Sequence, residues 1–144
     1  HIPSHRYLYY LTPKGFSEKT RLTGEYLKAS LNFYKKARNE CNKIIARLEL
    51  ENIKYIILYD NNEFAEIIIL SALNTKVKVI GLLGDSPSYI GIPVYKIFPK
   101  RIKMDVVIIT CMKSTDERYK YLSNFINKNK IIMPSIFKHN NEKN

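Results

Sequence analysis

A run of apolar residues that passes directly into an amphipathic helix constrains the fold of this chain most. Residues 55–59 read Tyr-Ile-Ile-Leu-Tyr, which is the composition of a strand buried on both faces. Residues 62–73 follow with the spacing of a helix that is apolar on one side. A buried strand that leads into such a helix begins a βαβ unit, so the sequence predicts a parallel sheet covered by helices.

The rest of the chain continues this alternation of strands and helices. Residues 52–135 are therefore predicted to form one small α/β domain of the Rossmann-like type, a parallel sheet with flanking helices. The strands are expected at 54–59, 76–83, 93–95, 105–111 and 130–133, and the helices at 62–73 and 114–127.

The turn between the first strand and its helix lacks the glycines of a dinucleotide-binding turn. Such a turn has the form G-x-G-x-x-G/A, in which the glycines let a pyrophosphate approach the backbone. Here Asp60 and Asn62 occupy the first two glycine places, and only the small residue Ala65 remains. A chain that keeps the strand and the helix but loses these glycines is expected to keep the fold and to change its ligand. The turn therefore predicts a sensor or binding domain rather than a redox enzyme.

A long helix is predicted ahead of this domain, from Ser17 to about Glu51, with a break near Leu22–Gly24. Its apolar residues have a heptad-like spacing that one arginine interrupts. Such a stripe packs either against the chain's own core or against a second copy. The length of the helix favours the second alternative, a homodimer through residues 24–51. The stripe consists of Leu27, Leu31, Tyr34, Arg38, Cys41, Ile45 and Leu48.

The segment before the long helix has the features of a strand and a helix start. Residues 6–12 are rich in aromatic side chains, and Thr12 and Pro13 suit an N-cap and a first helical position. The run from Tyr9 to Thr23, which contains Leu-Thr-Pro-Lys-Gly, resembles the junction at which MarR-type transcriptional regulators leave their winged-helix domain. It is especially similar to the exopolysaccharide-associated subgroup, in which "TPxGxxEKxxLT" precedes a long charged helix.

This resemblance implies that residues 1–23 are the end of a winged-helix domain. They would include the wing strand at 6–12, and the recognition helix would lie upstream of His1. His5, Arg6 and Lys14 would then contact DNA phosphates, or they would be ordinary surface charges. The formal net charge of +11 permits the same two interpretations. It favours a polyanionic partner such as nucleic acid, or it reflects lysines that fill the solvent face.

A second resemblance covers about residues 53–135. The Gly-Ile-Pro-Val segment from Gly91 to Val94, and the strand from Asp105 to Thr110, are similar to "GIPVxG" and "DxVVIA" segments of small Rossmann-like domains. These domains precede sugar O-acyltransferases, and related ones occur in CoA-binding and nucleotide-sugar proteins. The resemblance implies a nucleotide, a nucleotide-sugar or a CoA-like molecule as the ligand.

In open parallel sheets, ligands bind beyond the carboxyl ends of the strands, where three turns of this sequence should meet. Asn61 and Asn62 tolerate left-handed backbone and would offer amides to sugar hydroxyls, or they would cap the helix. Asp85 would accept a hydrogen bond from a ribose or sugar hydroxyl, or it would start a turn. Lys113 would meet a phosphate at a helix N-terminus, or it would face solvent. The candidate ligand-binding residues are Asp60, Asn61, Asn62, Glu63, Phe64, Gly84, Asp85, Ser86, Thr110, Lys113 and Ser114.

The sequence offers no constellation typical of catalysis or of metal binding, so no enzyme and no metal are expected. Cys111, at the end of a strand, would be a nucleophile or, more simply, a buried thiol. Cys41 and Cys111 are isolated thiols, which fits a reducing cytoplasm. No apolar run approaches the ~20 residues that span a membrane, so no membrane association is expected. The polar tail at 136–144 is expected to be disordered.

Two hypotheses follow from these features. The first is part of a cytoplasmic transcriptional regulator whose α/β domain senses a small molecule or mediates assembly. The long helix would then carry a change in dimer geometry to the DNA-binding head. The second is an accessory or degenerate protein of nucleotide-sugar or polysaccharide biosynthesis, related to sugar O-acyltransferases.

Overall fold

The structure is a computed structural model that describes residues 13–86 and 89–135. By its internal contacts the chain divides into two compact units, residues 1–36 and residues 37–144. The described part of the first unit consists of helix alone, whereas the second unit contains the sheet. The tail at 136–144, predicted to be disordered, lies outside the described residues.

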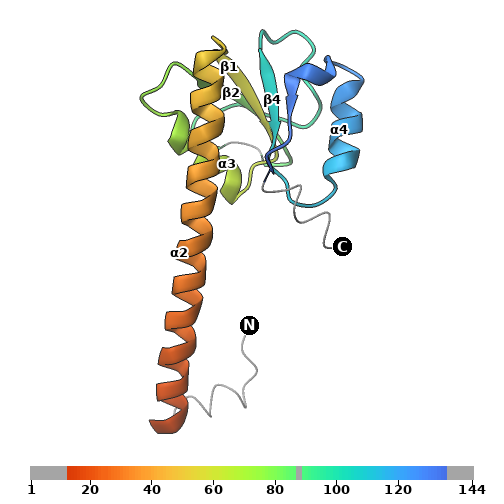
Figure 1. Ribbon diagram of the computed structural model, residues 1–144. Coiled ribbons are helices and arrows are strands. Elements are labelled where there is room, and N and C mark those ends of the chain that lie inside the picture. Colours follow the sequence, from red (N-terminus) through yellow and green to blue (C-terminus); the bar gives the residue numbers. More distant parts are fainter. Residues whose placement is uncertain (1–12, 87–88, 136–144) are drawn as a thin grey trace. The chain divides into compact units, whose positions relative to one another are not determined.

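Helix α2 (Pro13–Leu50) is continuous, so the predicted break near Leu22–Gly24 is wrong (Figure 1). Gly24 lies within the helix, and no atom is near the place that a Cβ would occupy. A glycine inside a helix weakens it, but here it does not interrupt the helix. The helix begins at Pro13 as predicted, since proline suits the first helical position. The strand expected at 6–12 and the N-cap expected just before Pro13 lie outside the described residues.

The apolar stripe of α2 has two environments along the helix. Ala37, Cys41, Ile45 and Leu48 are buried in the core of the second unit. Packing within the chain therefore accounts for the stripe from residue 37 onward, while an apolar surface remains exposed upstream. The large apolar side chains exposed there are Leu22, Tyr26, Leu27, Leu31, Phe33 and Tyr34.

The second unit is built on five strands that all run parallel, in the order β3-β2-β1-β4-β5. The predicted α/β fold, a small parallel sheet of Rossmann-like type with flanking helices and a long helix before it, is confirmed. β1 lies at the centre because it pairs with β2 on one side and β4 on the other. The strands are β1 (Tyr55–Tyr59), β2 (Lys78–Leu83), β3 (Val94–Tyr95), β4 (Val106–Ile109) and β5 (Ile131–Ile132).

Helices cover both faces of the sheet, so its strands are apolar on both sides (Figure 1). Ile56 and Leu58 of β1 pack with α3 (Glu63–Ala72) and with the last part of α2. Ile57, between them, points to the opposite face and packs in a second cluster that includes Leu122 of α4 (Thr115–Ser123). The second helix of the α/β alternation is shorter than expected, and a 3₁₀ turn, η1 (Lys128–Lys130), precedes β5.

Asp105 fixes the start of β4 against the start of β1. Its carboxylate accepts hydrogen bonds from the backbone N–H groups of Lys54 and Tyr55, each at 2.9 Å. The bond from Tyr55, then that from Lys54, lowers the pKa of the Asp105 carboxyl below its ordinary value, because both favour the charged form. The ionised carboxylate therefore stabilises the pairing of the two strands.

We expect this contribution to disappear in acid. A carboxyl whose pKa is lower in the folded state stabilises the fold above its unfolded pKa, and this stability is lost as pH falls through the folded pKa. The free energy of unfolding of wild type should therefore fall more steeply than that of Asp105→Asn as pH drops below about 4. Urea unfolding of both proteins from pH 7 to pH 3 measures the difference. Parallel pH dependence of the two curves would show that the bonds of Asp105 do not depend on its charge.

Candidate functional site at the carboxyl ends of β1 and β4

The strand order creates a switch point between β1 and β4. The chain leaves β1 through α3 toward β2, whereas it leaves β4 through α4 toward β5 on the other side. The two connections diverge from neighbouring strands, and both begin at the same edge of the sheet (Figure 1). Ligands of open parallel sheets bind at such a point. The candidate site is therefore built from the residues that follow Tyr59 and Ile109.

Asp60, in the first glycine place, adopts a backbone conformation that favours glycine. Its φ is +134°, a region that side chains other than glycine rarely allow. The hydroxyl of Thr110 lies 2.8 Å from the carbonyl oxygen of Tyr59 and 2.6 Å from that of Asp60, which fixes this turn to the end of β4. Neither Asn61 nor Asn62 has a positive φ, so the idea that these asparagines supply the left-handed backbone is wrong.

Asn62 is the N-cap of α3, as one of the two sequence interpretations predicted. Its Oδ1 accepts the backbone N–H of Ala65 at 2.9 Å, which satisfies one of the free donors of the first turn. Its Nδ2 donates to the backbone oxygen of Thr110 at 2.8 Å. One side chain therefore begins the helix and also links the connection after β1 to the connection after β4.

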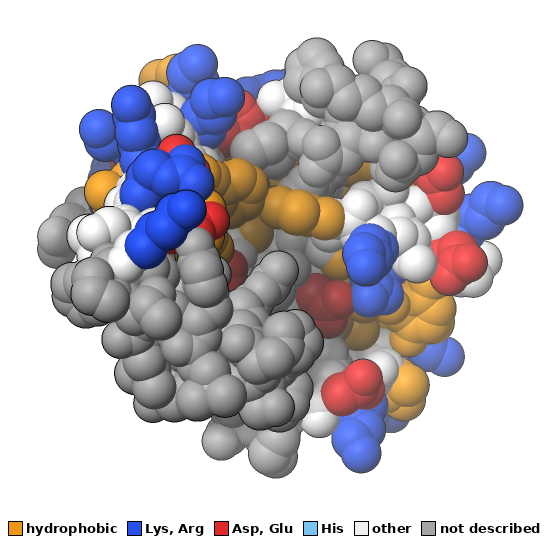
Figure 2. All heavy atoms as spheres, turned by 90° about the horizontal axis from the view of Figure 1, so that it is seen from below, with side chains coloured by type: hydrophobic (Ala, Val, Ile, Leu, Met, Phe, Trp, Pro, Cys, Tyr) orange, Lys and Arg blue, Asp and Glu red, His pale blue; other side chains and the backbone are white. Residues whose placement is uncertain are grey.

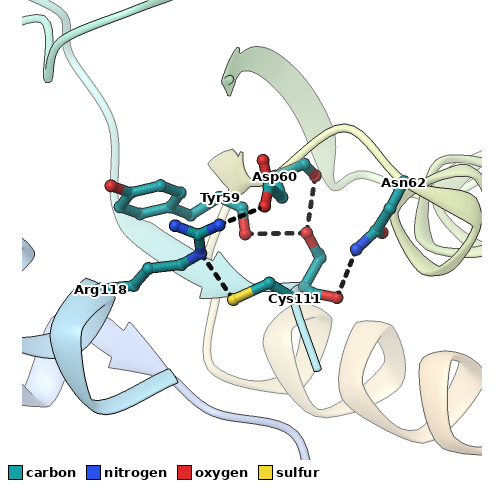
Figure 3. Close-up of polar contacts among 6 residues, drawn as sticks. Tyr59, Asp60, Asn62, Cys111 and Arg118 are labelled. Carbon is teal, nitrogen blue, oxygen red and sulfur yellow. Dashed lines mark hydrogen bonds and ion pairs between the residues drawn. The ribbon is translucent and has the colours of Figure 1, made fainter. Parts of the chain in front are cut away.

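Arg118 of α4 joins the same two connections through its charge (Figure 3). Its Nη2 donates to Oδ2 of Asp60 at 2.7 Å, and its Nε donates to Sγ of Cys111 at 2.7 Å. The guanidinium also lies over the ring of Tyr59, 5.0 Å from the ring centre. The side chains of Arg118 and Asp60 are each 28% exposed, so the ion pair is accessible at the edge of the sheet.

The electrostatics of this cluster favour a protonated thiol at Cys111. Burial raises the pKa of Cys111, and this effect outweighs the lowering by the charge and hydrogen bond of Arg118. For Arg118, burial disfavours the charged form, but Cys111 and Asp60 outweigh it and raise the pKa of the guanidinium. A buried structural thiol, rather than a nucleophile, is the interpretation of Cys111 that this environment favours.

Gly84 allows the turn after β2 to approach the turn after β1. A Cβ at this position would lie 2.7 Å from Oδ1 of Asn61 and 3.6 Å from Oδ1 of Asp60. Three of the predicted ligand-binding residues, Asp60, Asn61 and Gly84, therefore meet at the edge of the sheet. The next two, Asp85 and Ser86, follow Gly84 in an exposed and a half-buried position.

The other predicted residues have different places. Phe64 is a buried residue of α3 that packs in the core, and Thr110 is fully buried. Glu63 is exposed in the first turn of α3. Lys113 and Ser114 are exposed ahead of α4, and the left-handed Ser114 makes no side-chain cap. Of the predicted DNA contacts, Lys14 is exposed on α2, while His5 and Arg6 lie outside the described residues.

The helix ends at this edge are poorly suited to a pyrophosphate. The first turn of α3 contains Glu63 and Glu66, and that of α4 contains Asp116 and Glu117. Carboxylates already interact with the positive ends of these helix dipoles and repel a second anion. The loss of the glycines and the charge of the helix ends thus disfavour the same ligand.

Figure 2 views the protein from the side toward which the carboxyl ends of the strands point. Over its described part, acidic side chains lie among the basic ones, so the excess of basic residues does not give this face a single sign of charge. Among the described residues, no group of histidine, cysteine and acidic side chains could hold a metal ion. Within the same ranges, no helix is both long enough and apolar enough to cross a membrane.

Two hollows of the second unit lie elsewhere. One, of about 510 Å³, is lined by Ile44 and Arg47 of α2 and by Lys130 and Ile132 near the edge strand β5. The other, of about 470 Å³, lies beside the end of α3 and is lined in part by Ile90. Neither includes a predicted ligand-binding residue, so the site rests on the polar cluster at the switch point.

Arg118 and Tyr59 were not predicted from the sequence. Tyr59 was visible as the last residue of the strand before the unusual turn. Arg118 was visible as a basic residue one turn into the helix that follows β4. No local pattern distinguishes this arginine from exposed lysines nearby, because its partners Asp60 and Cys111 come from other parts of the chain.

Comparisons of the chain with protein-family models, with curated proteins and with solved structures gave no match.

Proposed function

We propose that this chain is the C-terminal part of a DNA-binding transcriptional regulator, in which the sheet unit senses a small molecule at the switch point. The observation that carries the proposal is the polar cluster of Asp60, Asn62 and Arg118, which joins the two diverging connections. A ligand that binds there would change how α3 and α4 are held together. The resemblance to small Rossmann-like domains suggests a nucleotide, a nucleotide-sugar or a CoA-like molecule, whereas the carboxylates in the first turns of α3 and α4 favour a smaller polar molecule without a pyrophosphate.

The winged-helix part of the proposal is supported by the residues around the start of α2. The Leu-Thr-Pro-Lys-Gly junction leads into a helix of 38 residues that begins at its proline, Pro13. In the regulators it resembles, a helix of this kind serves dimerisation. Coupling to DNA requires the ligand to bind the two dimer geometries with different affinities.

A direct test uses the product of the whole reading frame that encodes this chain. Thermal-shift measurements with nucleotide-sugars, CoA, nucleotides and sugar acids identify a ligand, since a ligand of the folded state raises the melting temperature. Gel-shift titrations on promoter DNA with and without that ligand then test the coupling. A protein of polysaccharide biosynthesis would bind no promoter DNA, and an upstream transferase domain would contradict the proposal.

We further propose that the regulator is a homodimer through the exposed apolar side chains of α2. Burying a leucine contributes about 1.5–3 kcal/mol, so Leu27→Glu with Leu31→Glu should weaken association at least about a hundredfold. Sedimentation of the 144-residue chain should show a dimer for wild type and a monomer for this variant. The matched control is Asn32→Glu with Asn39→Glu, which makes the same charge change at two exposed positions of α2. A wild-type monomer, or a variant that stays dimeric, contradicts the proposal.

A further inference from the structure

The guanidinium of Arg118 is held along one edge and lies over an aromatic ring. Of its five N–H groups, the one on Nε and one on Nη2 form the edge that donates to Cys111 and Asp60. The guanidinium carbon also lies over the ring of Tyr59, 5.0 Å from the ring centre (Figure 3). These three contacts fix the plane of the guanidinium before any ligand arrives, so little side-chain entropy is lost on binding.

The adjacent edge of the guanidinium, formed by Nη1 and Nη2, has no such partner in the part of the chain that the structure describes. Among residues 13–86 and 89–135, no acceptor is found for the two N–H groups of Nη1 or for the second N–H of Nη2. Arg118 is also 28% exposed, which leaves it in reach of a solute. Two parallel N–H groups on one edge match the two oxygens of a planar oxyanion.

We infer that this edge of Arg118 is the receptor for the carboxylate of a small organic acid at the switch point. The inference rests on the proposed sensing function and names the chemical class of its ligand. The carboxylate would accept two N–H bonds from Nη1 and Nη2, while Asp60 and Cys111 keep the guanidinium in place. No bond of the resting cluster has to break.

The charges around the site favour a single negative charge on the ligand. Asp60 already neutralises much of the charge of Arg118, and Glu63 and Asp116 stand in the first turns of the two helices. A phosphate dianion or a pyrophosphate would be repelled by these carboxylates, whereas a carboxylate adds only one charge. The charge of the surroundings therefore selects a carboxylate over a phosphate.

The polar groups beside Asp60 suit a ligand that also has hydroxyl groups. Oδ1 of Asp60 is not the oxygen that binds Arg118, and it lies near Gly84 together with the amide of Asn61. A carboxylate oxygen accepts hydrogen bonds from hydroxyl groups, and an amide beside it can also donate to them. The class of ligand is thus a small hydroxy acid, of which a sugar acid is one example.

The test is an NMR titration of the 144-residue chain that follows the side-chain N–H signals of its arginines. The probes are acetate and inorganic phosphate at pH 8, at constant ionic strength set with chloride. We expect acetate to shift the Arg118 signals in a saturable way and phosphate to bind at least about fivefold more weakly. The exposed Arg101 is an internal control, whose signals should not saturate.

Two variants complete the test. Arg118→Lys keeps the charge but lacks the planar fork, so the saturable shifts that acetate causes in the backbone N–H signals of Asp60 and Cys111 in wild type should be lost in this variant. Asp60→Asn removes the competing negative charge, so acetate should bind about two- to fivefold more tightly. Equal responses of Arg118 and Arg101 in wild type would overturn the inference, and this reading does not depend on how the variants fold. Stronger binding of phosphate than of acetate would overturn it as well.

These outcomes are separate from those of the proposed function. Acetate binding at Arg118 in a protein that binds no DNA would support the carboxylate site and contradict the proposal of a DNA-binding regulator. Promoter binding that responds to a nucleotide-sugar, without acetate binding at Arg118, would support the regulator and contradict the carboxylate site.

Discussion

Replacement of Leu58 by alanine should lower the free energy of unfolding by about 2–5 kcal/mol, the range for large-to-small changes in a packed core. Leu58 is fully buried in β1, the central strand, and packs between the neighbouring strands and the helices of one face. The surrounding side chains are fixed by strands on both sides, so the cavity cannot collapse easily. Urea unfolding followed by circular dichroism, at one fixed protein concentration because the chain is proposed to dimerise, gives the difference.

Leu70→Ala is the matched control for this substitution. Leu70 lies on α3 and is 46% exposed, so the same deletion removes less buried surface and adds a better helix former. We expect its effect to stay within about 1 kcal/mol of wild type. Equal losses for Leu58→Ala and Leu70→Ala would mean that β1 is not the centre of the core.

The strands of this protein could be predicted because a parallel sheet buries both of its faces. The runs at 55–59 and 106–109 are apolar at consecutive positions, not at alternate ones, and the structure places helices on both sides of them. The first helix after β1 was equally visible, since Asn62 is a good N-cap and apolar residues follow at helical spacing.

The environment of α2 could be predicted only in part. The heptad-like spacing shows that one side of the helix is covered, but the same spacing serves a partner helix and a sheet of the same chain. The structure assigns Cys41, Ile45 and Leu48 to the core of the sheet unit. Leu27 and Leu31 have the same spacing and are exposed, which no property of the residues themselves distinguishes.

The candidate site was predicted in its location but not in its interactions. Strand order brings the turn after β1 and the turn after β4 together in any sheet of this kind, so Asp60 and Thr110 were expected at one edge. The ion pair of Asp60 with Arg118 depends on the length and direction of α4 over several residues. The backbone of Asp60 depends on contacts across the sheet as well, because an isolated aspartate has no reason to adopt a φ of +134°.

Replacement of Asn62 by alanine should lower the free energy of unfolding by about 2–4 kcal/mol, because one side chain makes two bonds of different kinds. Loss of an N-cap costs about 1 kcal/mol, and a buried carbonyl without its donor costs about 1–3 kcal/mol. The two groups concerned are the N–H of Ala65 and the backbone oxygen of Thr110. Urea unfolding of wild type and variant measures the sum.

Asn62→Ser separates the two contributions. Serine is a good N-cap, so the bond to Ala65 should remain, but it cannot reach Thr110 with an amide donor. The loss for Asn62→Ser should therefore be about half of that for Asn62→Ala. If the serine variant is as stable as wild type, the link between the connections contributes nothing, and Asn62 acts only as a cap. If it is as unstable as the alanine variant, the bond to Thr110 dominates. Asn62 is then the residue that would couple a ligand at Arg118 to the connection after β1.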